Sequence, residues 1–110
     1  MISSEARELV LWVENTERLY NQMMYVFRLL ARKRDKGTYD PKKAPKAFRA
    51  LLEAAAKHYM RENAARGEKW FVTFPVIVRR EAAQELVETF DGWYGVDYQA
   101  EKNRGTPTAQ

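Results

Sequence analysis

Apolar side chains recur at steps of three and four residues through the first third of the chain. Such spacing is typical of a helix that buries one face. The stripe consists of Leu9, Trp12, Val13, Thr16, Leu19, Tyr20, Met23, Val26, Phe27 and Leu30. Ser3 or Ser4 is placed to cap the start of this helix. Glu5 and Glu8 follow in the first turn, where the helix dipole favours negative charge.

The length of this segment argues against one straight helix that ends near Arg34. About thirty residues at ~1.5 Å each would extend ~46 Å, whereas a compact chain of this size is about 34 Å across. We therefore expect a helix that is kinked or broken near Asn15. In the alternative, residues 9–13 form a short strand or a separate turn, and Asn15 caps a helix that starts at Thr16.

Met23, Met24 and Tyr25 widen the stripe, so that apolar side chains almost surround this part of the helix. Burial on two sides is the expected consequence. Either this is the central helix of the bundle, or one of its sides meets a second subunit. The protein is accordingly expected to be a monomer or a homodimer.

The chain then turns and starts a second helix. Gly37 is suited to the left-handed conformation that closes a helix. Asp40 is placed as the cap of the next helix, with Pro41 at its first position. Because Pro45 lacks an amide proton, we expect a bent opening or a regular helix that begins nearer Ala44.

The second helix is rich in alanine and is expected to end at Ala65 or Arg66, with Gly67 as its stop. Its predicted apolar face consists of Ala44, Phe48, Leu51, Leu52, Ala55 and Tyr59.

Residues 70–78 would read as a strand if Pro75 were absent, since a proline is unfavourable in a central strand. We expect Pro75 to start a third helix instead, and Asp91 with Gly92 to end it. The predicted shared face holds Val76, Arg79 or Arg80, Ala83, Leu86, Val87 and Phe90. Trp93, Tyr94 and Tyr98 are expected to fold back on the core.

The fold class predicted from these patterns is all-α, a small helical bundle of three main helices, either with or without a separate N-terminal segment. We expect one helical domain over residues 1–98 and a flexible tail over 99–110. The hydrophobic content of 45% is ordinary for a soluble domain, and the lack of cysteine excludes disulfide scaffolds. The acidic start and the short apolar runs predict a cytoplasmic protein.

Positive charge is concentrated in residues 28–49, here called the basic joint. This segment holds nine Lys or Arg and two Asp, a net charge of +7, whereas the whole chain carries +4. The cations of a helix end, a turn and the free N–H groups of the next helix together predict an anion site. Tyr39 would either stack on a base or pack under the turn. The candidate nucleic-acid contacts are Arg28, Arg32, Lys33, Arg34, Lys36, Tyr39, Lys42, Lys43, Lys46 and Arg49.

Two other interpretations of the basic joint stay open. Cations collect at a helix C-terminus because they suit its dipole, which accounts for three or four charges but not for nine. An acidic protein partner would also suit this charge. Arg79 and Arg80 oppose the dipole at the start of the third helix, which predicts a salt bridge to Glu14 or Glu17, or an extension of the basic surface.

No catalytic constellation is visible, so we expect a protein that is not an enzyme and needs no cofactor or metal. His58 is the only histidine and lies near an apolar face, where a packed or half-exposed side chain is expected. The carboxylates are spaced as solvated helix faces, and the chain has no glycine-rich phosphate loop.

Four segments resemble a family of small proteins, without assigned activity, that tailed bacteriophages and related mobile elements encode. They are ENTERLY (14–20), RKRDKGTYD (32–40), AAKHYMRE (55–62) and FPVIVRREAAQEL (74–86). The resemblance implies a small accessory protein in a bacterial cytoplasm, with a role against host defence.

These observations predict a non-enzymatic binding module whose basic joint binds nucleic acid or a nucleoprotein complex. The alternative is a phage-type inhibitor that binds a host defence complex, for example an antagonist of the anti-CRISPR kind. In that alternative, Trp93 and Tyr94 would contact the protein partner, since aromatic side chains dominate protein–protein binding energy.

Overall fold

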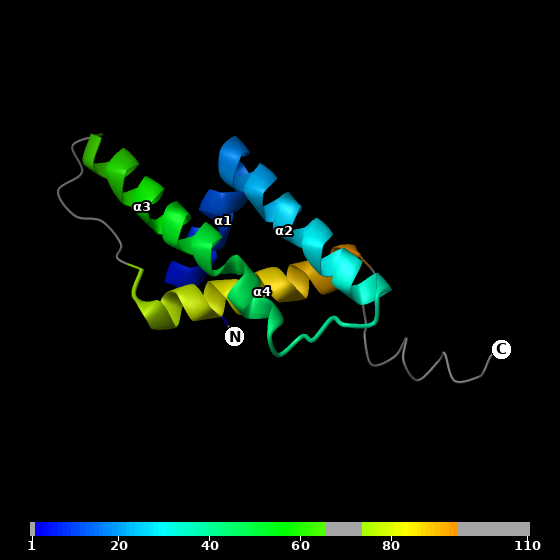
Figure 1. Cartoon of the computed structure of the whole chain (residues 1–110). Coiled ribbons are helices and arrows are strands. Elements are labelled where there is room, and N and C mark those ends of the chain that lie inside the picture. Colours follow the sequence, from blue (N-terminus) through cyan, green and yellow to red (C-terminus); the bar gives the residue numbers. More distant parts are fainter. Residues whose placement is uncertain (1, 66–73, 95–110) are drawn as a thin grey trace.

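The computed structural model describes residues 2–65 and 74–94, which form helices joined by short turns (Figure 1). No strand occurs within those two ranges. The elements are α1 (Ser4–Asn15), α2 (Glu17–Asp35), the 3₁₀-helix η1 (Ala44–Phe48), α3 (Arg49–Ala65) and α4 (Val76–Trp93). The predicted all-α class is confirmed, and the N-terminal segment is a helix of its own. No helix of the described part is long and apolar enough to cross a bilayer.

The first apolar stripe is divided between two helices that pack against each other and against α3. Thr16 separates them with an extended backbone (φ −112°, ψ 111°). The predicted break near Asn15 is therefore confirmed, and the alternative of a strand over residues 9–13 is wrong. The break lets both halves of the stripe face one core, which a single rod could not do.

Ser3 caps α1, as one of the two predicted serines. Its Oγ accepts the N–H of Ala6 at 3.2 Å. The same hydroxyl donates to Oε1 of Glu81 on α4 at 2.6 Å. A local capping residue thus also joins the first helix to the last.

Gly37 closes α2 in the left-handed conformation, with φ of +77°. The N–H of Thr38 donates to the carbonyl of Lys33 at 2.8 Å, and that of Gly37 donates to the carbonyl of Arg34 at 3.0 Å. This pair of bonds is the Schellman motif, which satisfies carbonyls that the helix end would otherwise leave without partners. The predicted stop of α2 is confirmed.

The restart of the helix is more gradual than predicted. Asp40 caps a turn over residues 41–43, η1 follows, and regular α-helix begins only at Arg49. A bent opening is thus confirmed, but the prediction that Asp40 and Pro41 start the helix itself is wrong. Pro45 has no N–H to donate, which favours the tighter η1 over a first α-helical turn.

The core is built around Phe27 of α2, whose side chain is fully buried. Its ring lies 5.7 Å from that of Phe48 in η1, 5.6 Å from Phe90 in α4 and 5.6 Å from Trp93. Three elements therefore meet at one aromatic side chain. The predicted apolar face of the second helix is buried throughout, from Ala44 to Tyr59.

The prediction for α4 needs two corrections. Val76 is 52% exposed, and the buried stripe consists of Val78, Ala82, Ala83, Leu86, Val87 and Phe90. The helix also continues through Gly92 to Trp93 instead of ending at Asp91. A glycine costs only ~1 kcal/mol inside a helix, and the contact of Trp93 with Phe27 offsets that cost. Gly67, Tyr98 and the tail over 99–110 lie outside the described residues.

Helix α2 is not surrounded on all sides. Tyr25 (56%) and Leu29 are exposed, whereas Met24 is half-buried against the core. The prediction of burial on two sides within the bundle is therefore wrong, because the part of the helix surface that carries Tyr25 and Leu29 is exposed.

We expect Phe27→Ala to lower the free energy of unfolding by ~3–5 kcal/mol, because the loss leaves a cavity where three elements meet. Tyr25→Ala in the same helix is the matched control, since its side chain is exposed, and should cost below ~1 kcal/mol. Urea denaturation of both variants measures the difference. Equal losses would contradict the assignment of the core face.

We expect Gly37→Ala to destabilise the protein by ~1–2 kcal/mol through backbone strain, since left-handed backbone is unfavourable for a residue with Cβ. No heavy atom of the described part lies within 4 Å of the added Cβ, so crowding is not the cause. Gly37→Asn should cost less, because asparagine tolerates this conformation. A loss that is the same in both variants by thermal unfolding would argue against strain.

Candidate nucleic-acid interface

Eight of the nine cations in the basic joint have exposed side chains, and Arg34 is half-buried. Within the described part of the chain, seven of the eight have no ion pair. They are Arg28, Arg32, Lys33, Lys36, Lys42, Lys43 and Lys46. The eighth, Arg49, is 84% exposed and lies 4.0 Å from Oε1 of Glu53, a distance at the limit of an ion pair. The charge excess of the sequence is therefore available at the surface.

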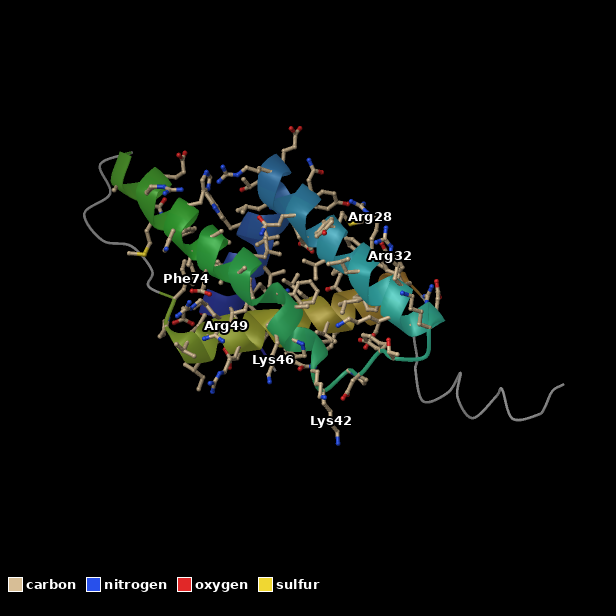
Figure 2. All side chains as sticks on the ribbon, in the orientation of Figure 1. Arg28, Arg32, Lys42, Lys46, Arg49 and Phe74 are labelled. Carbon is tan, nitrogen blue, oxygen red and sulfur yellow. The ribbon has the colours of Figure 1, made fainter. Side chains whose placement is uncertain are left out.

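The basic joint presents its cations in two groups (Figure 2). Arg28 and Arg32 lie on α2, whereas Lys42, Lys46 and Arg49 follow the chain from the turn through η1 to the start of α3. The second group extends the positive surface away from the end of α2.

The Arg34 side chain bonds to other residues of the protein. Its Nη1 donates to the carbonyl of Tyr94 at 3.0 Å, and its Nε lies 3.1 Å from Oδ1 of Asp35. The first bond joins the end of α2 to the end of α4. Arg34 thus helps to hold the two helix ends together, and its contact with nucleic acid stays a prediction.

Tyr39 packs under the turn, and the alternative of base stacking is wrong. The side chain is only 3% exposed, and its ring lies 5.5 Å from that of Phe90. Its hydroxyl donates to Oδ1 of Asp91 at 3.0 Å. Burial, and then the charge and hydrogen bond of Asp91, raise the pKa of Tyr39 far above its ordinary value.

The amide groups after the turn do not form the predicted anion site. Oδ1 of Asp40 accepts the N–H of Lys42 at 2.9 Å. The carbonyl of Asp40 accepts the N–H groups of Lys43 and Ala44, both at 3.0 Å. Because Asp40 occupies these donors, side-chain cations alone provide the positive surface here.

Three cations that the sequence did not single out line a groove between α2 and α3. The groove has a volume of about 360 Å³ and is lined by Arg18, Ala50, Glu53, Ala54, Lys57 and Arg61. Lys57 and Arg61 follow Arg49 at helical spacing, a signal that was visible in the sequence. Arg18 precedes them by about forty residues, and only the packing of α2 near α3 brings it to them.

Arg79 has a partner that the sequence did not predict. Its Nη1 lies 3.8 Å from Oε2 of Glu53 on α3, and no ion pair with Glu14 or Glu17 occurs in the described residues. Both predicted partners are therefore wrong, although a structural salt bridge is present. Arg80 is exposed.

His58 is a packing residue, as expected. Its Nδ1 accepts the N–H of Trp12 at 3.0 Å, and the two rings lie 5.6 Å apart. Across residues 2–65 and 74–94, no three His, Asp or Glu side chains gather to hold a metal ion.

The two aromatic residues at the end of α4 differ in exposure. Tyr94 is half-buried and stacks on Phe90, with ring centroids 4.9 Å apart. Trp93 packs one edge against Phe27 but stays 52% exposed. The predicted packing onto the core is confirmed for Tyr94, and Trp93 keeps a surface that a partner can contact.

We expect Tyr39→Phe to cost ~1–2 kcal/mol at neutral pH, through the lost hydrogen bond to a carboxylate. Because the folded state raises the pKa of Tyr39, the hydroxyl stabilises the protein below the ordinary tyrosine pKa of about 10. That stabilisation decreases as the pH rises above this value.

The difference in unfolding free energy between wild type and Tyr39→Phe should thus narrow from about pH 9 to about pH 11. Urea denaturation at both pH values measures it. A difference that stays constant would contradict the buried state of the hydroxyl.

Comparison with known proteins adds no further indication of function. No protein-family model, curated protein or solved structure matches this chain. Function is therefore inferred from the side chains themselves, above all from the exposed cations of the basic joint.

Proposed function

We propose that this protein is a non-enzymatic binding module that contacts the phosphate backbone of nucleic acid through the basic joint. The observation that carries the proposal is the set of seven exposed cations that have no ion pair within the described residues. Clustered cations of this kind release counterions from nucleic acid on binding, which is the main source of affinity that does not depend on sequence.

The position of Lys43 and Lys46 supports binding of a negatively charged partner, because these lysines do not compensate the negative end of an α-helix dipole. Cations near the end of α2 suit the negative end of its dipole. Lys43, by contrast, directly precedes η1, and Lys46 lies in the last turn of η1, which directly precedes α3; neither element has an acidic residue in its first turn. Positive charge at a helix start is unfavourable, so a partner with negative charge would relieve this cost.

The chemistry of the surface favours contacts with phosphates over contacts with bases. Tyr39 is buried and so provides no stacking platform. The amide groups beside Asp40 are occupied. Lysine side chains act as mobile point charges, which position a backbone but do not read base edges. Binding with little sequence preference is the expected result.

A second candidate function is supported by Trp93. Its half-exposed ring is suited to a protein partner, because tryptophan is enriched at the centres of protein interfaces. Together with the resemblance to phage proteins, this supports an inhibitor of a host defence complex. In that case the basic joint would face an acidic protein surface.

We expect the purified protein to shift duplex DNA of random sequence at low salt, with log affinity falling against log salt at a slope of about −3 to −5. This value follows from about four phosphate contacts at ~0.9 each. The variant Arg28→Gln/Arg32→Gln/Lys42→Gln/Lys46→Gln should make the slope less negative by up to ~3.6, through the loss of up to four contacts at ~0.9 each. Its helicity should stay intact, because glutamine is a comparable helix former.

Trp93→Ala is the control that separates the two candidate functions. It should leave the DNA affinity unchanged under the first proposal, and weaken binding to a protein partner under the second. A folded wild-type protein that shifts neither duplex nor single-stranded oligonucleotides at low salt would contradict nucleic-acid binding.

A further inference from the structure

The groove between α2 and α3 is the strongest unassigned feature of the surface. Three cations line it, Arg18 from α2 and Lys57 with Arg61 from α3, against one carboxylate, that of Glu53. We infer that it is a second phosphate-binding site, which continues the nucleic-acid path of the basic joint along α3. This inference rests on the proposed function and names the site that the nucleic-acid backbone would contact after the basic joint.

Small residues create the groove. Ala50 and Ala54 are one helical turn apart on α3 and line the groove between the longer side chains. Their methyl groups offer no donor or acceptor that could recognise a base edge. The polar chemistry of the groove therefore comes from the charged side chains, which suits phosphate groups.

Glu53 does not neutralise the groove cations. A glutamate four residues before a lysine can form an ion pair along a helix, as Glu53 and Lys57 could. The structure instead places the Glu53 carboxylate 4.0 Å from Nε of Arg49 and 3.8 Å from Nη1 of Arg79. Two arginines outside the groove thus offset its only negative charge.

The three groove cations are left available to a ligand. Arg18, Lys57 and Arg61 are exposed, and none of them has an ion pair with another described residue. The charges of the lining residues sum to +2, three cations less Glu53, around an open space of about 360 Å³. This exceeds the charge of one phosphodiester group, so the groove suits two adjacent phosphates of one strand.

The groove continues the second group of joint cations. Lys46 and Arg49 lead from η1 into α3, as Figure 2 shows, and Lys57 and Arg61 follow on the same helix. From Lys46 to Arg61 the axis rises ~24 Å, from about three residues at ~2.0 Å and twelve at ~1.5 Å. That length corresponds to about seven base pairs of duplex at ~3.4 Å each.

The test compares two double variants with the same change of charge. Arg18→Gln/Arg61→Gln removes two arginines of the groove. Arg7→Gln/Arg80→Gln removes two arginines elsewhere, the two exposed cations of the described residues that lie outside both the joint and the groove. Fluorescence anisotropy with a labelled 20-base-pair duplex of random sequence, over a range of salt concentrations, gives Kd and the salt slope.

We expect the groove variant to flatten the salt slope by ~1.8 and to raise Kd about 60-fold at 0.1 M salt, through two lost phosphate contacts. The control variant should bind as wild type does. Thermal unfolding of both variants should match wild type, because all four side chains are exposed.

The failures of the two proposals are distinguishable. If wild type binds the duplex and the groove variant keeps the same Kd and slope, the groove is not a phosphate site and the basic joint binds alone. If both double variants lose affinity equally, the effect is one of net charge, and the inference is overturned. If wild type itself does not bind, the proposed function falls.

Discussion

The packing of Phe27 is the contact on which the rest of this fold depends. Its ring lies within 6 Å of four other aromatic rings, from η1 and from the end of α4. Elements that are far apart in the sequence thus share one buried side chain. The basic joint starts in α2 and ends in η1 and the first residue of α3. Because Phe27 packs α2 against η1, this packing also determines where the joint lies.

The basic joint is held to the core by two bonds that come from its own residues. Tyr39 donates to Asp91, and Arg34 donates to the carbonyl of Tyr94, so that the turn is tied to the end of α4 at two points. The other eight cations of the joint have exposed side chains. Under the proposed function, this anchored turn would bind a nucleic-acid backbone without first ordering a flexible loop, which would lower the entropic cost of binding.

The positive surface of the structure differs from the basic joint that the charges of the sequence predict. Arg34 and Tyr39 bond to the end of α4, and Asp40 occupies amide groups of the turn. Outside the joint, Arg18, Lys57 and Arg61 line a groove between α2 and α3. Glu53 lies near Arg49 and Arg79, and Lys57 has no ion pair within the described residues. The basic surface thus extends along α3, beyond the segment with the highest charge density.

The sequence by itself determined the features that depend on neighbouring residues. These are the apolar stripes, the cap at Ser3, the left-handed stop at Gly37 and the helix that begins after Pro75. Each is decided within a turn or two of helix, where spacing and backbone preference act directly. Only the tertiary structure decided the partners of Arg34, Tyr39 and Arg79, and the approach of Arg18 to α3. Those partners lie tens of residues away, and it is the packing of whole helices around Phe27, not local preference, that brings them together.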